Sequence, residues 1–333
     1  MIRKNLVIGL ALSCGIILGS GTADAKKISC GAPTAAPLVT GLQGATGSTV
    51  GPGGALYVTE GAAGRISRVD PQTGEVTTFA SGLPPAIAPI GGAIDVAFIG
   101  STAYVLVTLV DAFVGGNDVD GIYRVDGPDS FAVVADIGEF NLDNPPTTPF
   151  DVPTGVQYAL QTYRGGFLVT DGHLNRVLRV TVDGEVSVLI AFGDIVPTGL
   201  AVWGNTVYMA EAGPVPHLPE NGKVVAFGPK SPTPTEVASG APLLVDVEFG
   251  RGRLPYALSQ GPGVVGAPPG SPAQPDSGAL VKVNGDGTFT VITDGLNLPT
   301  SLEFIGNTAF VVTLTGEIWR IDDVSGPPYG GSR

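Results

Sequence analysis

One sequence pattern returns six times along this chain of 333 residues. Each copy contains an alternating apolar strand, a Gly-containing tight turn, a strand of the type Leu-Tyr-Val-Thr-Glu, a loop of variable length, a Gly-x-Ile/Val-x-Arg-Val-Asp segment and a Thr/Val-rich strand. The first copy is the clearest, with LYVTE at residues 56–60, GRISRVD at 64–70 and EVTTF at 75–79. A repeated unit of four short strands is typical of a β-propeller blade.

The sixth copy lacks its last strand, because the pattern stops after Asp322. Residues 38–42 (LVTGL) resemble the ends of earlier copies at residues 78–83 and 291–296. An N-terminal strand that completes the last blade closes the ring and removes exposed sheet edges. The sequence therefore predicts an all-β fold, a six-bladed β-propeller of four-stranded antiparallel blades over residues 36–325. A β-sandwich and a β-helix are the alternatives, but neither predicts a four-strand repeat with a permuted last member.

The first 25 residues are typical of a secretory signal peptide. Arg3 and Lys4 precede an apolar stretch, and residues 23–25 (ADA) form a small-x-small cleavage site. The apolar stretch is shorter than the roughly 20 residues needed to span a bilayer. We therefore expect a secreted or periplasmic protein with no transmembrane segment in the mature chain. Residues 26–35 would be a lead-in segment and residues 326–333 a flexible C-terminal tail.

The amino-acid composition restricts the fold class and the kinds of partner that the protein can bind. The 50 Gly and 29 Pro residues disfavour helical folds, while 43% hydrophobic residues argue for a buried core. The 17 basic and 30 acidic residues give a formal charge of -13, which opposes binding to nucleic acid or to an anionic membrane. Cations and neutral or positively charged ligands remain as candidate binding partners. Cleavage would leave Cys30 as the only cysteine, so no intrachain disulfide is expected.

The connections between strands sort onto two faces of the ring, because alternate connections of an antiparallel meander lie at the same edge. One face receives short Gly-containing turns. The other, called the loop face below, receives the long connections at residues 109–120, 136–152, 212–221 and 259–277. Long loops on a rigid scaffold usually carry binding residues. The Gly/Pro-rich segment 261–275 is either a mobile lid or a tolerated insertion.

Charged and titratable residues of the loop face are the candidate ligand-binding residues. Glu60, Asp171 and Glu211 end the second strand of three copies, and His173 and His217 are the only histidines. Either histidine is a candidate general base, and His173 is the candidate catalytic residue. The alternative is that the carboxylates cap strand ends and that both histidines are ordinary polar loop residues.

The third position of each leading strand should line the central channel near its mouth. The six copies carry there Ser48, Asp95, Gly155, Gly199, Asp246 and Ser301. Asp95 and Asp246 lie three blades apart and are the candidate metal ligands, because Ca²⁺ prefers carboxylate and other oxygen ligands. One ion held by both would need a narrow mouth.

Three sequence stretches, LYVTE at 56–60, GRISRVD at 64–70 and PTGL at 197–200, follow the export signal and resemble the ScyD/ScyE family of secreted propeller proteins. The likeness covers nearly the whole mature chain, and NHL-type and sugar-lactonase-type propellers share parts of the repeat. The family is named for a gene cluster of scytonemin, a cyanobacterial indolic sunscreen. The resemblance implies the fold and export, but no settled reaction.

Two functions of different classes follow from these observations. One is a non-catalytic extracytoplasmic propeller that binds a small molecule, a glycan or a protein through its loop face. The alternative is a Ca²⁺-dependent hydrolase or lyase that resembles gluconolactonase or strictosidine-synthase-type propellers, with the ion polarising a carbonyl and His173 or a carboxylate as base. Those relatives place Asn and Asp ligands on successive inner strands, whereas Gly155, Gly199 and two serines stand here. The binding function is therefore favoured.

Overall fold

The computed structural model describes residues 33–228, 231–268 and 270–324. The predicted signal peptide at 1–25 and the predicted tail at 326–333 lie outside the described residues. The first strand, β1, begins at Thr34, within the predicted lead-in segment. In the described part of the chain, no helix is long and apolar enough to cross a membrane.

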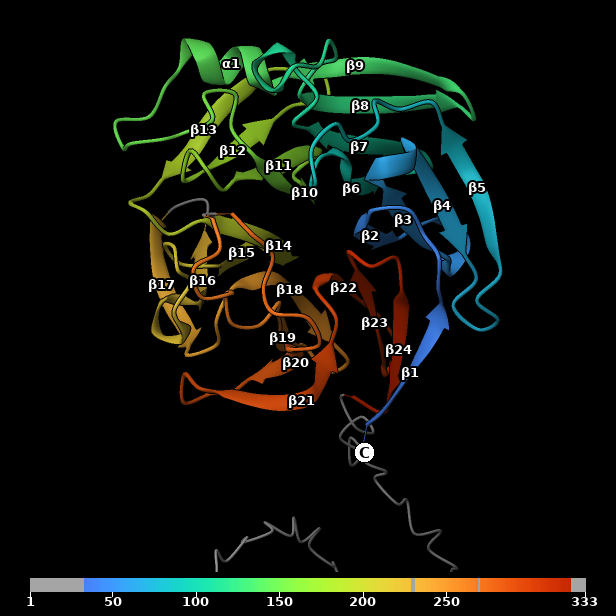
Figure 1. Ribbon diagram of the computed structural model, residues 1–333, viewed down its shortest axis with the longest axis vertical. Coiled ribbons are helices and arrows are strands. Elements are labelled where there is room, and N and C mark those ends of the chain that lie inside the picture. The colour runs from blue at the N-terminus through green and yellow to red at the C-terminus, as the bar shows by residue number, and fades with distance from the viewer. Residues whose placement is uncertain (1–32, 229–230, 269, 325–333) are drawn as a thin grey trace, which may run out of the picture. The chain divides into compact units, whose positions relative to one another are not determined.

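Six four-stranded antiparallel sheets surround a central channel, as the repeats predict (Figure 1). Blade 1 contains β2 (Ala45–Val50), β3 (Leu56–Glu60), β4 (Arg65–Val69) and β5 (Val76–Ser81); blade 2 contains β6 (Gly92–Ile99), β7 (Thr102–Thr108), β8 (Gly121–Gly127) and β9 (Ser130–Asp136); blade 3 contains β10 (Gln157–Tyr163), β11 (Gly166–Asp171), β12 (Arg176–Val180) and β13 (Val186–Ala191). Blade 4 contains β14 (Pro197–Trp203), β15 (Thr206–Glu211), β16 (Lys223–Gly228) and β17 (Ser231–Ser239); blade 5 contains β18 (Leu244–Gly250), β19 (Leu254–Ser259), β20 (Gly278–Val283) and β21 (Phe289–Leu296); blade 6 contains β22 (Pro299–Ile305), β23 (Thr308–Thr313), β24 (Ile318–Asp322) and β1 (Thr34–Val39).

Blade 6 is completed from the other end of the chain, which confirms the predicted closure. Strand β1 pairs antiparallel with β24, with Ala35 opposite Ile321 and Pro37 opposite Trp319. Figure 1 shows the blue β1 beside the red β24. The pairing leaves no sheet of the ring with three strands.

The hydrophobic core lies between blades. Six clusters of buried side chains join neighbouring blades pairwise around the ring, including the seam between blades 6 and 1. At the first seam, Tyr57 of blade 1 packs against Phe98 of blade 2 with ring centroids 4.7 Å apart. Each fully buried large apolar side chain contributes about 1.5–3 kcal/mol, so the blades stabilise one another through these seams.

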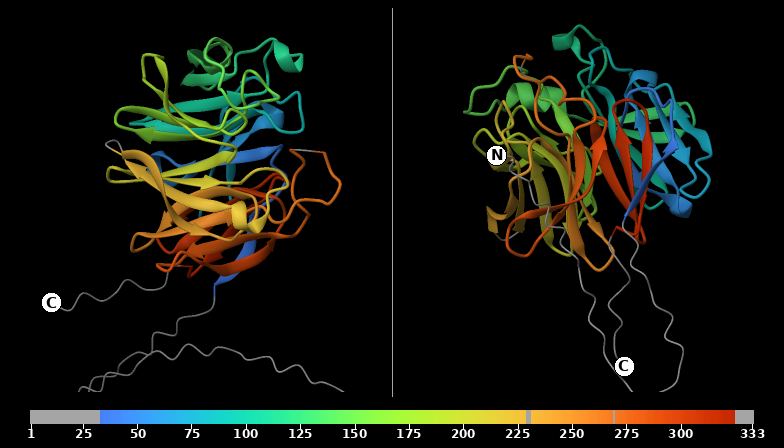
Figure 2. Two further views of the ribbon diagram at one scale, coloured as in Figure 1. Left: turned by 90° about the vertical axis from the view of Figure 1, so that its left-hand side faces the viewer. Right: turned by 60° about the horizontal axis from the view of Figure 1, so that its bottom comes forward.

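Helical segments are short and belong to connections. They are the helix α1 (Ile137–Asp143) and the 3₁₀ turns η1 (Pro52–Gly54), η2 (Gly61–Ala63), η3 (Ala112–Val114) and η4 (Pro219–Asn221). The side chain of Asp136 caps α1 by accepting a hydrogen bond from Glu139 N at 2.7 Å. In the left panel of Figure 2, the green α1 segment and the orange loop between β19 and β20 project from the same side of the ring. That side is the predicted loop face.

Candidate functional site

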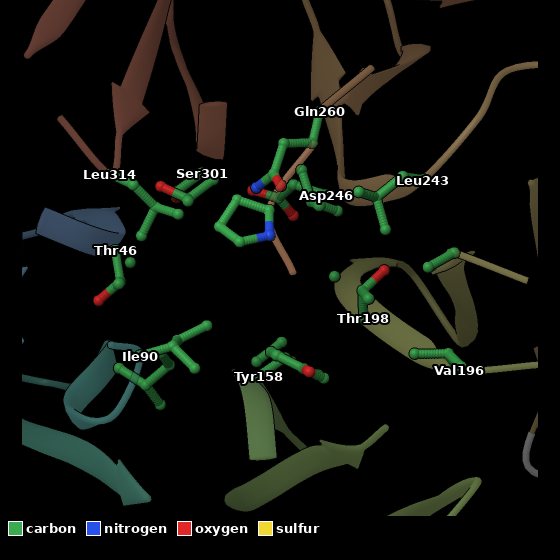
Figure 3. Close-up of a pocket in the computed structure, with 18 of the residues that line it drawn as sticks. Thr46, Ile90, Tyr158, Val196, Thr198, Leu243, Asp246, Gln260, Ser301 and Leu314 are labelled. Atoms are coloured by element: carbon green, nitrogen blue, oxygen red, sulfur yellow. The ribbon is translucent and has the colours of Figure 1, made fainter. Parts of the chain in front are cut away.

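A cavity of about 180 Å³ lies at the mouth of the central channel on the loop face (Figure 3). All six blades contribute to it through two consecutive residues near the start of their innermost strands. These residues are Thr46 and Gly47, Ile94 and Asp95, Tyr158 and Ala159, Thr198 and Gly199, Val245 and Asp246, and Thr300 and Ser301. The labelled side chains of Figure 3 converge on this common space from different blades.

A β-bulge sets these positions. The pairing of each innermost strand with its neighbour shifts register at this point in all six blades. A bulge re-aims side chains and twists the strand locally. The cavity walls are therefore built by the bulged residues of six equivalent strands.

The predicted channel positions are correct in four blades and wrong in two. Gly47, not Ser48, lines the cavity in blade 1, and Ala159, not Gly155, lines it in blade 3. Gly155 lies in the connection before β10, with φ 81°. The Pro-Thr-Gly sequence at residues 197–199 begins β14, but the same sequence at residues 153–155 lies four residues earlier relative to β10. Aligning Gly155 with Gly199 therefore shifts the register of β10 by four residues.

Loops supply an apolar collar above the strands. Ile90, Val196, Leu243 and Leu314 line the cavity from connections between blades and within blade 6. Pro89 lies beside them in the lining. The collar makes the entrance favourable for an apolar body and unfavourable for a fully hydrated ion.

The Gly/Pro-rich loop between β19 and β20 reaches the cavity. Its residues Gly270, Ser271 and Pro272 are part of the lining. Gln260 fixes the base of the loop by accepting a hydrogen bond from Ala273 N at 3.1 Å, and Gly263 and Ala273 form an antiparallel bridge. The loop is thus a folded part of the cavity wall rather than an insertion remote from it.

Two carboxylates from opposite sides of the ring form matching contacts in the cavity. Asp95 Oδ1 accepts a hydrogen bond from Val96 N at 2.8 Å, and its Oδ2 accepts one from Leu160 N of the next blade at 2.7 Å. Asp246 repeats this arrangement with Val247 N at 2.8 Å and Leu302 N at 2.7 Å. Each carboxylate therefore ties its blade to the following one.

Glycine precedes each carboxylate in the ring for a steric reason. A Cβ atom at Gly47 would lie 2.4 Å from Asp95 Oδ1, and one at Gly199 would lie 2.3 Å from Asp246 Oδ1. Real Cβ atoms do not approach other heavy atoms so closely. The two Gly–Asp pairs are thus one structural device used twice.

Four carboxyl groups interact at and beside the cavity; Asp95 and Asp246 line it, whereas Glu248 and Glu303 do not. Burial raises the pKa of Asp95 well above its ordinary value, and the charge of Asp246 raises it further. Burial raises the pKa of Asp246 to about 7, although hydrogen bonds from Leu302 and Val247 act in the opposite direction. Burial and the charge of Asp246 raise the pKa of Glu248 to about 8. Burial and the charges of these three carboxylates raise the pKa of Glu303 well above its ordinary value.

Sequence reasoning missed Glu248 and Glu303. They lie two residues beyond Asp246 and Ser301 on β18 and β22. Alternate residues of a strand share a face, so the alternation rule applied to the channel positions could have found both.

Glu60 and Asp171 hold loops rather than line the cavity. Glu60 is fully buried, pairs with Arg65 at 2.8 Å and accepts a hydrogen bond from Gln43 N at 2.7 Å. Burial alone would raise its pKa, but the hydrogen bonds outweigh burial and lower it. Asp171 is fully buried and accepts a hydrogen bond from Asn141 Nδ2 at 2.7 Å. The alternative interpretation of strand-end carboxylates as caps describes both residues.

His217 is the predicted loop-face residue that does line the cavity. Its Nδ1 lies 2.7 Å from Gly213 O, and because a carbonyl only accepts, Nδ1 donates and Nε2 is left as an acceptor. His173 is not among the lining residues, and burial lowers its pKa. Glu211 is 5% exposed, with its pKa raised by burial to about 7, and directly precedes the lining residue Ala212.

The donor set matches a calcium site poorly. Asp95 and Asp246 supply four side-chain oxygens, and Gly47, Ala159 and Gly199 add none toward the 6 to 8 that Ca²⁺ takes. Within the described residues, no three His, Cys, Asp or Glu side chains gather in a way that could hold a metal. Calcium binding by this pair stays a prediction.

Comparisons with known proteins give the fold alone. No protein-family model and no curated protein matches the chain. Several solved structures do match. Virginiamycin B lyase from Staphylococcus aureus is 13% identical over 87% of this chain and 98% of that chain, with a TM-score of 0.53. A gluconolactonase from Xanthomonas campestris is 13% identical over 86% of this chain and 89% of that chain, with a TM-score of 0.59, and a nidogen/laminin complex is 13% identical over 78% and 84%, with a TM-score of 0.53. Enzymes and a nidogen/laminin complex share this architecture, so fold does not assign the chemistry.

Proposed function

We propose that this protein is a secreted ScyD/ScyE-like propeller that binds a small molecule in the central cavity of its loop face. The observation that carries the proposal is the cavity itself, walled by all six blades and by Gly270, Ser271 and Pro272 of the loop above. Small-molecule sites are typically preformed and concave, with mostly apolar walls and a few oriented polar groups. The cavity has this character, and a protein or an extended glycan would not fit inside it.

The size of the cavity limits the ligand. Its volume of about 180 Å³ equals the share of roughly six water molecules in the liquid, at about 30 Å³ each. Among the polar lining residues, the hydroxyl of Tyr158 can orient a bound molecule. The Thr198 hydroxyl and the Gln260 amide already form hydrogen bonds within the protein. The signal peptide expected at residues 1–25 supports a location outside the cytoplasm.

A blocking variant tests the proposal. Ile90→Trp adds a large side chain to the collar, whereas Ile87→Trp places the same change on the same connection at a residue that is 50% exposed and outside the lining. In a thermal-shift screen of small molecules, we expect compounds that raise the Tm of the wild type and of Ile87→Trp, because a ligand bound only by the native state stabilises it. Their affinity for Ile90→Trp should fall at least about tenfold, or 1.4 kcal/mol. Equal stabilisation of all three proteins would place the binding elsewhere.

A lyase or hydrolase is the second candidate function, and His217 is the observation that favours it. The geometry of His217 leaves Nε2 as a base at the cavity wall. A histidine-to-alanine variant of the S. aureus lyase, solved with quinupristin, is catalytically inactive. If the chain is an enzyme of this class, His217→Gln should lose turnover of a cyclic ester or lactone and keep its affinity. Full turnover in that variant would remove His217 as the base.

A further inference from the structure

The charges around the cavity are unbalanced. Asp95 and Asp246 face each other across it, while no lysine or arginine stands among the residues that line it. Glu248 and Glu303 add two carboxylates close enough to repel Asp246. When these carboxyl groups are ionised, a neutral ligand leaves their negative charge uncompensated, whereas a cation offsets it and favours their ionisation.

The two aspartates are held as acceptors. Their four hydrogen bonds from backbone N–H groups are 2.7 or 2.8 Å long, within the range of charge-assisted bonds. These donors favour the ionised form, but burial outweighs them and raises the pKa of both groups. A cation bound between the two groups would favour their ionised forms. A carboxylate has about four lone-pair sites, so each group keeps acceptor capacity for a ligand.

The glycines let the strand of the preceding blade approach each carboxylate closely, and this observation is independent of the charge of the carboxylates. A side chain at position 47 or 199 would begin within 2.4 Å of Asp95 Oδ1 or 2.3 Å of Asp246 Oδ1, in a strand that itself lines the cavity. Both positions carry glycine, so one oxygen of each carboxylate has no side chain from the preceding blade against it. The same close approach occurs twice, three blades apart.

The collar defines the rest of the ligand. Ile90, Val196 and Leu243 surround the entrance with apolar surface. A small inorganic cation would gain nothing from this surface, whereas an apolar substituent would be removed from water there. The lining therefore suits a molecule with one charged end and one apolar end.

From these observations we infer that the ligand is an organic ammonium ion with a compact apolar body. Its N–H groups donate to Asp95 and Asp246, and its body lies against the collar beneath residues 270–272. This inference rests on the proposed small-molecule function and names the ligand class.

Matched probes test the inference. A panel of primary ammonium ions with apolar substituents, beginning with benzylammonium, is titrated calorimetrically beside the neutral isosteres, beginning with benzyl alcohol. We expect at least one ammonium ion to bind ten times more tightly than its isostere. Asp95→Asn and Asp246→Asn should each remove this preference while binding of the neutral isostere is kept, which also shows that the variants are folded. Asp126→Asn, at an exposed carboxylate of β8, is the matched control and should change nothing.

The outcomes separate the inference from the function on which it rests. If neutral compounds bind in a manner blocked by Ile90→Trp but no ammonium ion is preferred, the cavity function stands and the cation inference fails. If a preference for ammonium survives both Asp→Asn variants, the carboxylates do not recognise it and the inference fails. Stabilisation by Ca²⁺ alone that is lost in Asp246→Asn, with no response to any ammonium ion, would make the pair a metal site instead.

Discussion

The two halves of the ring carry the same carboxylate contact in different surroundings. In blades 1 to 3, Asp95 stands between Gly47 and Leu160; in blades 4 to 6, Asp246 stands between Gly199 and Leu302. The backbone contacts agree to 0.1 Å or better in donor–acceptor distance. The hydrogen bonds that join each aspartate to the following blade are therefore the same in the two halves.

The side chains next to these contacts differ. The second half carries Glu248 and Glu303 where the first half, at the same strand positions, carries Ala97 and Gln161. It also carries Ser301, whose hydroxyl lies 2.8 Å from Ser48 Oγ across the closing seam, where the first half carries Ala159. The backbone contacts of the two aspartates are repeated, whereas the side chains beside these contacts differ between the halves.

The largest effect is expected at the repeated glycines. Gly47→Ala and Gly199→Ala each place a Cβ atom against a carboxylate oxygen and against backbone, with Asp95 Cα at 2.6 Å and Asp246 Cα at 2.4 Å. Overpacking of this kind costs about 1–3 kcal/mol, and we expect similar losses at both sites in chemical denaturation. Gly193→Ala, where a Cβ would meet nothing within 4 Å, is the control. A loss at only one of the two sites would break the equivalence of the halves.

A smaller effect is expected from the acidic residues that make the halves unequal. The native pKa of Glu248, raised by burial to about 8, exceeds its ordinary 4.5, so the folded state binds its proton more tightly. This contribution to stability is fully present below pH 4.5 and is lost as the pH rises to about 8. Between pH 4.5 and 8, the free energy of unfolding of Glu248→Gln should therefore fall less than that of the wild type. We expect the difference to reach at least about 1.4 kcal/mol at pH 8, which is the value of one pKa unit.

The reverse substitution sharpens this test. Gln161→Glu gives the first half a carboxylate at the corresponding position and should steepen the loss of stability between pH 4.5 and 8. Urea denaturation at intervals across that range measures both slopes. If the two variants change the slope in the same direction, the asymmetry between the halves is not electrostatic.

The smallest effect concerns the closing seam. Ser301→Ala makes this seam resemble that between blades 3 and 4, and it removes the partner of Ser48 Oγ at 2.8 Å and of Ser48 N at 3.1 Å. The loss of a buried hydrogen bond costs about 1 kcal/mol, which we expect as a lowered denaturation midpoint. The double variant Ser48→Ala/Ser301→Ala removes both hydroxyls and should recover part of the loss. No loss in the single variant would show that the seam does not depend on this pair.

Much of the fold was predictable because its determinants are local. The repeats around residues 56–60 and 64–70 carry strand alternation and turn residues within short windows, and the missing last strand indicated the pairing of β1 with β24. The candidate site was predicted in part. Asp95, Gly199, Asp246 and Ser301 follow from the repeat, whereas Gly47 and Ala159 were misplaced by alignment.

The roles of loop-face residues were harder to predict. His173 and His217 look alike in sequence, but His217 lines the cavity because its loop carries it there with φ 60° and a hydrogen bond to Gly213. Glu60 and Glu211 end equivalent strands, yet Glu60 meets Arg65 while burial raises the pKa of Glu211. Such differences depend on neighbours that are distant in sequence.

By itself, the sequence determined the number of blades, their strand order and the closure of the ring, since alternation and turn chemistry act between residues close along the chain. The tertiary structure decided the cavity. Its walls require six bulges in register, two glycines opposite carboxylates of the next blade and residues 270–272 folded over the mouth. These are packing relations between distant segments, and only the closed ring brings the segments together.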